Sequence, residues 1–144
     1  MNSSAVVYSS SNTSVATISG SIVTLVGAGG SVITASQESN ENYNATTVTA
    51  TLSVAKDDVL LSGLSDLIKI YGDDSFELDF DSTSNGSLSF NSSDLDVATV
   101  SGSLMIVTGV GSTVLTINQS ESDNYNAVID SIVLQVQKRP LRRY

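Results

Sequence analysis

The chain contains one stretch of sequence twice. Residues 8–56 align without a gap with residues 90–138, at an offset of 82 positions, and 20 of the 49 paired positions are identical. The run Asn-Tyr-Asn-Ala occurs in both copies, at residues 42–45 and 124–127. This period is longer than the 20–50 residues typical of solenoid repeats. It therefore predicts a tandem array of small whole domains.

Composition and patterning predict strands. The sequence is rich in Val, Ile, Thr and Ser, and Val, Ile and Thr favour strands. No apolar pattern with a helical period persists for three turns, so we expect no substantial helix. Apolar and polar residues alternate over residues 48–54, which predicts a half-buried strand. The strongest strand pattern lies between residues 76 and 81, where three large apolar residues alternate with three carboxylates. About seven short strand segments over residues 57–138 predict an all-β protein, with an antiparallel sandwich of two sheets in each unit.

The repeat divides the chain into a partial and a complete unit. We expect residues 1–56 to form the partial unit and residues 57–138 the complete one, with the boundary at Lys56-Asp57-Asp58. The first unit lacks a counterpart of residues 57–82, which we expect to supply the first two strands of one sheet. Its strand edges and one apolar face would then be uncovered. We expect the chain to be cut from a longer array, with strand donation by a second chain as the alternative.

The charge of the chain is unevenly distributed. Residues 1–137 carry 15 acidic side chains against Lys56 and Lys69, a net charge of −13. The other four basic residues form a tail within residues 138–144, and residues 139–144 look like the start of a further unit. An acidic body repels nucleic acid and anionic membranes. No apolar run is long enough to span a bilayer. We therefore expect neither nucleic-acid binding nor membrane insertion.

The residue types needed for common catalytic sites are missing. The sequence has no His and no Cys, which excludes Ser-His-Asp and Cys-His arrangements. The carboxylates of Glu77 and Asp79 lie at exposed strand positions without an apolar pocket. The glycine pairs at 27 and 29 and at 109 and 111 precede strands, so we interpret them as turns with positive φ and not as phosphate loops. The sequence predicts a non-catalytic protein.

Calcium is the one cofactor that the sequence allows. Candidate ligands are the paired carboxylates Asp57, Asp58, Asp73 and Asp74. Calcium needs six to eight oxygen ligands, and an ion at Asp57 and Asp58 would stiffen the junction between units. The alternative is a solvated acidic surface that binds no ion.

Two tyrosines are candidates for ligand binding. Tyr43 and Tyr125 occupy the same position in the two copies, inside polar, Asn-rich loops. Exposed aromatic rings at these positions could bind a glycan or a protein. The alternative is that each ring packs over one end of its sandwich.

The repeated motifs resemble those of a known domain type. The run Ser9–Thr17, with its Ser-Ser-Asn-x-x-Val-Ala-Thr pattern, together with Gly20 and residues 27–29, resembles bacterial immunoglobulin-like repeats of large surface and adhesin proteins. The Asn-Tyr-Asn-Ala element is also similar to that of such repeats, and the second copy departs from the pattern at residues 94–96.

The resemblance implies an immunoglobulin-like sandwich at the cell surface or outside the cell. It also implies a structural spacer whose partners are neighbouring repeats. The alternatives are a module that binds a glycan or host protein, and a subunit that assembles by strand exchange, so that the chain would be a monomer or a strand-exchanged oligomer.

Overall fold

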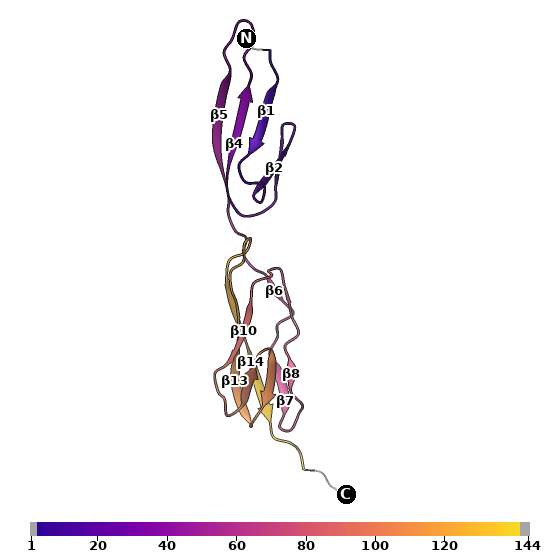
Figure 1. Ribbon diagram of the computed structural model, residues 1–144. Coiled ribbons are helices and arrows are strands. Elements are labelled where there is room, and N and C mark those ends of the chain that lie inside the picture. The colour runs from indigo at the N-terminus through magenta and orange to yellow at the C-terminus, as the bar shows by residue number, and fades with distance from the viewer. Residues whose placement is uncertain (1–2, 142–144) are drawn as a thin grey trace. The chain divides into compact units, whose positions relative to one another are not determined.

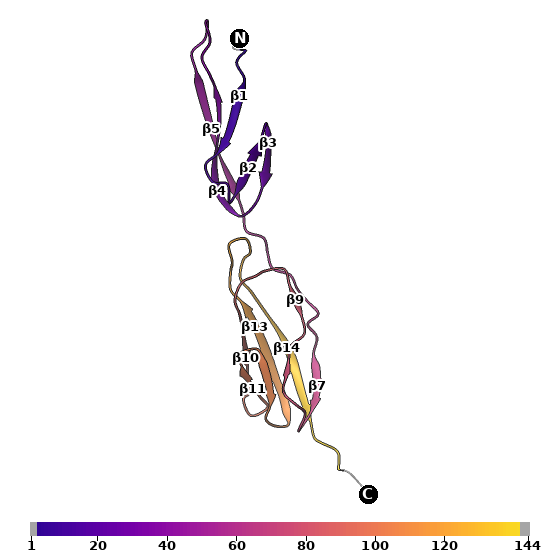
Figure 2. The same ribbon diagram turned by 45° about the vertical axis from the view of Figure 1, so that its right-hand side comes forward.

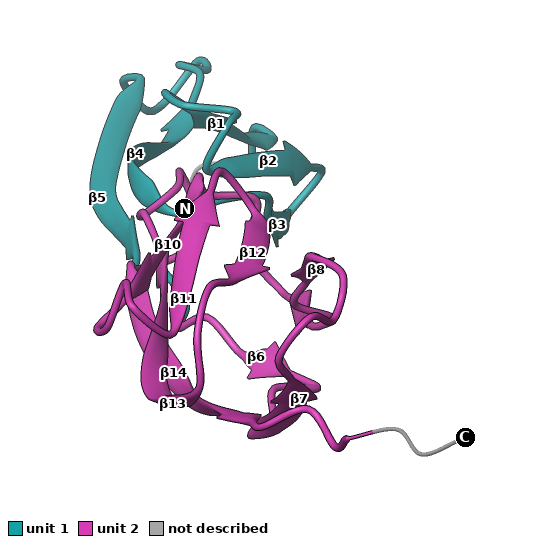
Figure 3. Cartoon of the chain, turned by 90° about the horizontal axis from the view of Figure 1, so that it is seen from below, with its two compact units in different colours: residues 1–57 teal, residues 58–144 magenta. Residues whose placement is uncertain are grey.

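The computed structural model describes residues 3–141 and divides into two compact units. Unit 1 comprises residues 1–57 and unit 2 comprises residues 58–144 (Figure 3). The described residues form fourteen strands and no helix. The all-β, immunoglobulin-like sandwich predicted from the sequence is thus confirmed, and each unit is described by itself below.

Unit 2 is a sandwich of two main sheets (Figure 1). One sheet has the order β10-β13-β14-β7 and the other has the order β11-β12-β8, while β6 and β9 form a separate pair. The strands of unit 2 are β6 (Leu61–Ser62), β7 (Leu67–Ile70), β8 (Phe76–Glu77), β9 (Asp81–Ser82), β10 (Leu88–Ser92), β11 (Ala98–Ser101), β12 (Leu104–Val107), β13 (Gly111–Gln119) and β14 (Val128–Gln137).

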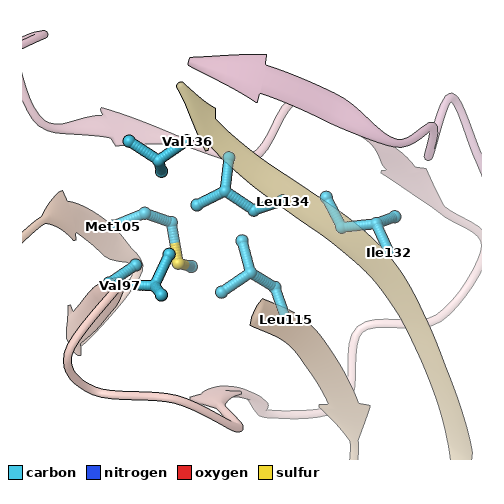
Figure 4. Close-up of a cluster of buried hydrophobic side chains, with 7 residues drawn as sticks. Val97, Met105, Leu115, Ile132, Leu134 and Val136 are labelled. Atoms are coloured by element: carbon cyan, nitrogen blue, oxygen red, sulfur yellow. The ribbon is translucent and has the colours of Figure 1, made fainter. Parts of the chain in front are cut away.

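The core of unit 2 lies between these two sheets. Met105 of β12 and Leu134 of β14 are both 0% exposed, and they belong to one cluster contributed by both sheets. Figure 4 shows its larger members, which are Val97, Met105, Leu115, Ile132, Leu134 and Val136. Three of them alternate along β14 with exposed residues, as the period of two in a strand requires.

Unit 1 repeats most of this architecture. Its sheet has the order β1-β4-β5, and β2 and β3 form a hairpin beside it (Figure 2). Each of its five strands corresponds at the offset of 82 residues to a strand of unit 2. The strands of unit 1 are β1 (Val6–Ser10), β2 (Ala16–Ser19), β3 (Ile22–Leu25), β4 (Gly29–Gln37) and β5 (Thr46–Val54).

The serine motif shared by both copies fixes the turn after the first strand of each repeat. In unit 2 the buried Thr113 hydroxyl accepts the backbone N–H of Asp94 (2.9 Å) and bonds the Ser92 hydroxyl (2.8 Å). In unit 1 the buried Ser31 hydroxyl makes the same contacts with the backbone N–H of Asn12 (3.2 Å) and the Ser10 hydroxyl (2.7 Å). The motif therefore has a structural role, because these buried hydroxyls bind the backbone of the turn that follows the strand.

Residues 57–82 differ in two ways from the expectation. They do not supply two strands of one sheet, because β7 joins one sheet and β8 joins the other. The side chains of residues 76–81 alternate between partly buried and exposed as predicted, but β8 ends at Glu77 and β9 begins at Asp81. The predicted continuous strand is wrong, since residues 78–80 lie between two different pairing partners, β12 and β6.

One strand pair departs from a purely antiparallel sandwich. β7 runs parallel to β14, with Leu67 opposite Leu134 and Ile70 opposite Gln137. All other strand pairs among residues 3–141 are antiparallel. Two parallel strands need a long crossover between them. Residues 71–127 supply it here by forming most of the unit.

The glycine pairs make turns, but only half of them need a positive φ. Gly29 and Gly111 have φ of 130° and 141°, whereas Gly27 and Gly109 are not in the positive region. At Gly109 the requirement is one of space, because a Cβ atom there would collide with the carbonyl oxygen of Asp96.

Candidate functional site

The acidic candidates form two pairs in the sequence, and one carboxylate of each pair accepts a hydrogen bond. The Asp73 carboxylate accepts the backbone N–H of Ile70 (2.8 Å) and so stabilises the turn after β7. The Asp58 carboxylate accepts an N–H of the Asn126 side chain (2.9 Å). Asp57 precedes Asp58 directly and is exposed.

These carboxylates do not gather into a metal-binding group. Among residues 3–141, no three acidic side chains are placed so that they could hold one ion together. Asp73 and Asp74 line a shallow cleft of about 430 Å³, and Arg139 lines the same cleft. A guanidinium there brings positive charge, which disfavours a second cation. The calcium role of Asp57, Asp58, Asp73 and Asp74 stays a prediction.

The two candidate tyrosines have different surroundings. Tyr43 is 46% exposed, and Tyr125 is partly buried. The loop of Tyr43 is ordered by Asn40, whose side-chain oxygen accepts the backbone N–H groups of Asn42 (3.0 Å) and Tyr43 (2.9 Å). In unit 2 the backbone N–H of Ser122 donates to the carbonyl of Tyr125 (3.0 Å), as Asn40 does to Tyr43 (2.9 Å). The two loops thus share one backbone hydrogen bond, and the Tyr43 side chain is more exposed than that of Tyr125.

Unit 2 also contains an open cleft that the sequence did not indicate. Its volume is about 820 Å³, and its lining includes Phe80, Phe90 and Gln119. The two phenylalanine rings meet edge to face with centroids 6.1 Å apart. The Gln119 side chain is buried, and it donates to the carbonyl of Gly86 (2.9 Å). The cleft combines phenylalanine rings with serine hydroxyls, and the Ser103 hydroxyl in its lining donates to the Glu77 carboxylate (2.9 Å).

The most unusual surface belongs to unit 1. Val23 is 43% exposed and Leu25 is 61% exposed, although both stand in a strand of the sandwich. Met105, the unit 2 counterpart of Val23, is completely buried. Val15 and Ala16 of unit 1 are buried, as their counterparts Val97 and Ala98 in unit 2 are. Unit 1 thus exposes apolar side chains that unit 2 covers.

The half-buried strand predicted for residues 48–54 is only partly buried. Leu52 and Val54 are partly buried, but Val48 and Ala50 are exposed. The alternation of side chains follows from the strand geometry and is present. The expected burial of its first half is wrong, because no second layer covers that part of β5.

Comparison with known proteins gives only distant similarities. No protein-family model matches the sequence, and no curated protein sequence is significantly similar to it. The solved structures that match it include three at 11–12% identity. An endo-fucoidan hydrolase of glycoside hydrolase family 107 has a TM-score of 0.42, and the match covers 96% of this chain and 24% of that one. For Drosophila N-cadherin EC1-4 the TM-score is 0.39, with 94% of this chain and 42% of that one covered. For human protocadherin-24 EC1-2 the TM-score is 0.38, with 96% of this chain and 84% of that one covered. This chain therefore spans less than half the length of the first two.

Proposed function

We propose that the chain is a non-catalytic spacer segment of a secreted or surface-displayed bacterial repeat protein of the adhesin type. Neighbouring immunoglobulin-like repeats are its partners, and it needs no cofactor. The proposal rests on the repeat, on the absence of His and Cys from the sequence, and above all on the way β7 and β14 are joined in unit 2.

The parallel pair of β7 and β14 suits a segment that is stretched from its ends. β7 lies near the beginning of unit 2 and β14 near its end, and the two strands run in the same direction. A pull on both ends of the unit acts on the start of β7 and on the end of β14. The hydrogen bonds between them are then sheared together and do not open one after another. This geometry resists extension because several bonds must break in one step.

Side chains and turns extend this pair at both ends. The Asp66 carboxylate accepts the backbone N–H of Val133 (2.8 Å), just before β7 begins. The backbone N–H of Tyr71 donates to the carbonyl of Gln137 (2.9 Å), just after β7 ends. The sheared interface thus runs from Asp66 to Tyr71.

The surface charge fits the same role. An array of such units carries like charge throughout, since residues 1–137 have a net charge of −13. Like charge keeps repeats soluble and prevents lateral association. None of the described residues forms a helix that could cross a membrane.

Stretching the single chain between handles at its two ends tests the proposal. We expect unit 2 to unfold in one step that releases on the order of 250–300 Å, from roughly 3.6 Å for each of about 80 extended residues. Lys69→Pro should lower the unfolding force strongly, because proline removes an N–H from β7 and distorts the pair. Val97→Ala, which weakens the core without touching the pair, is the control. An unfolding force that falls equally in both variants would contradict the spacer proposal.

A glycan- or protein-binding role is the second candidate, and the exposure of the Tyr43 ring favours it. It would make Tyr43 the contact residue and would leave unit 2 as the support. Binding of this chain to a glycan array that Tyr43→Ala abolishes and Tyr125→Ala leaves unchanged would establish this role. Binding that is equal in both variants, or no binding, would exclude it.

A further inference from the structure

Six apolar residues of unit 1 form a surface whose counterparts in unit 2 are buried or partly buried. We call this surface the open face of unit 1 and define it by Tyr8, Val23, Leu25, Ala50, Leu52 and Val54. Each of them is more exposed than the residue 82 positions later in the sequence, and four of those counterparts are fully buried. Because the two units share their strands and turns, the difference in exposure has one cause, which is the missing cover.

Unit 2 shows which residues supply that cover. Leu67, Phe76 and Leu78 pack against its core, and the ring of Phe80 meets that of Phe90. The covering residues belong to the segment 57–82, for which unit 1 has no counterpart; these residues are Leu67, Phe76, Leu78 and Phe80. The cover turns after β7, so that β7 and β8 join different sheets, and β9 pairs back with β6. Over residues 76–81 its apolar side chains are partly buried and its carboxylates are exposed.

Two strand edges of unit 1 are available for the same segment. Among the described residues, β5 is paired only with β4, and β3 only with β2. In unit 2 the corresponding strands have one more neighbour each, since β14 also pairs with β7 and β12 also pairs with β8. Unpaired edges beside an exposed apolar surface are the features that strand addition uses.

We propose that the open face of unit 1 is a binding site for a segment of the same sequence type as residues 57–82, supplied by a further repeat. The segment adds parallel to β5 and antiparallel to β3. Residues 57–82 of this chain cannot fill the site, because they already complete unit 2. This site follows from the comparison of the two units and does not depend on the spacer role.

The register of unit 2 predicts the register of the bound segment. Leu67 stands opposite Leu134, so the residue of the segment that matches Leu67 should stand opposite Leu52. Phe76 stands opposite Met105, so the residue that matches Phe76 should stand opposite Val23. The residue that matches Phe80 then reaches Tyr8, as Phe80 reaches Phe90.

A peptide with the sequence of residues 57–82 tests the site on the full chain. We expect it to bind with one site per chain and to shift the amide resonances of β3 and β5, while those of β12 and β14 stay unchanged. A peptide with Leu67→Asp and Phe76→Asp should bind at least about 100-fold more weakly, because each buried large apolar side chain contributes about tenfold or more. The matched control is Ile68→Thr, since Ile68 is exposed in unit 2.

The direction of the bound peptide is a second readout. The chain has no Cys, so a single spin label can be placed on a peptide that carries Ile70→Cys. A parallel strand places this label beside the end of β5 near Val54, and an antiparallel one places it nearer the start of β5.

Several results would overturn the proposal. The proposal would be wrong if the peptide did not bind, or if the doubly substituted peptide bound as tightly as the original one. It would also be wrong if the spin label broadened the resonances at the start of β5, or if the peptide shifted the resonances of β12 and β14 instead of those of β3 and β5. Dimerisation of the chain through β3 and β5 that the peptide does not reverse would identify a second copy as the occupant, and the proposal would be wrong.

Discussion

Replacing Leu134 by alanine should destabilise unit 2 strongly. The side chain is 0% exposed and packs within the cluster that both sheets of unit 2 form. Its truncation removes buried apolar surface and leaves a cavity that neighbouring side chains cannot fill completely. From such substitutions in other cores, we expect a loss of about 3–4 kcal/mol in the free energy of unfolding. That is a large share of the roughly 5–15 kcal/mol by which a typical domain is stable.

The same substitution at Leu52 should cost much less. Leu52 is the counterpart of Leu134 in unit 1, but it is partly exposed. Since no second layer encloses it, truncation leaves no closed cavity, and only the reduced apolar burial remains. We expect about 1–1.5 kcal/mol, so that the two substitutions differ by about 1.5–3 kcal/mol.

Urea denaturation followed by amide resonances assigned to each unit would measure both losses in the intact chain. Val15→Ala and Val97→Ala form the control pair, because both valines are almost completely buried. Their costs should agree within about 0.5 kcal/mol, the usual error of such comparisons. Equal costs for the two leucine substitutions would refute the reasoning, because Leu52 would then have to be as enclosed as Leu134.

Three further predictions concern the turns and the acidic residues. Thr113→Val should destabilise unit 2 by about 1–3 kcal/mol, because the backbone N–H of Asp94 loses its acceptor. Thermal unfolding would detect this loss, and an unchanged melting temperature would contradict the prediction. Gly109→Ala should lower the free energy of unfolding by about 1–3 kcal/mol, because the new Cβ atom collides with the carbonyl of Asp96. Gly102→Ala is the control for backbone strain alone, because φ is positive there but the space is open. Equal spectra and stability of the wild type and Gly109→Ala would argue against the collision. Millimolar calcium should leave the melting temperature unchanged, because no three carboxylates of the described residues converge. A rise in the melting temperature that Asp73→Asn abolishes would show an ion site at the turn after β7.

The sequence was sufficient to predict the repeated half of each unit. The 49-residue alignment predicted repeated units, and the structure has five matching strands in the two copies. Residues 132, 134 and 136, which alternate with exposed residues, lie on the buried side of β14. Residues shared by the two copies also make the same contacts. Ser10 in unit 1 and Ser92 in unit 2 each bond the hydroxyl of a buried residue. Local periodicity and repetition are sufficient for such features because each depends on neighbours within the same stretch.

Features that depend on distant pairing could not be predicted. The alternation from Phe76 to Phe80 predicted which side chains face inward, but not that the backbone leaves one partner and joins another. The parallel direction of β7 depends on the path of the whole crossover and has no local signal. The different exposure of Tyr43 and Tyr125 follows from their surroundings, because the same four-residue motif carries both.

Amide hydrogen exchange of the intact chain is the most direct test that unit 1 is the same sandwich without its cover. β14 lies between β13 and β7, so its amides at residues 134–137 should be strongly protected. β5 has β4 on one side only, so the amides at residues 52–54 that point away from β4 should exchange nearly as fast as in an unfolded chain. Equal protection of the two segments would show that the outer edge of β5 is already paired, and would contradict an incomplete first unit.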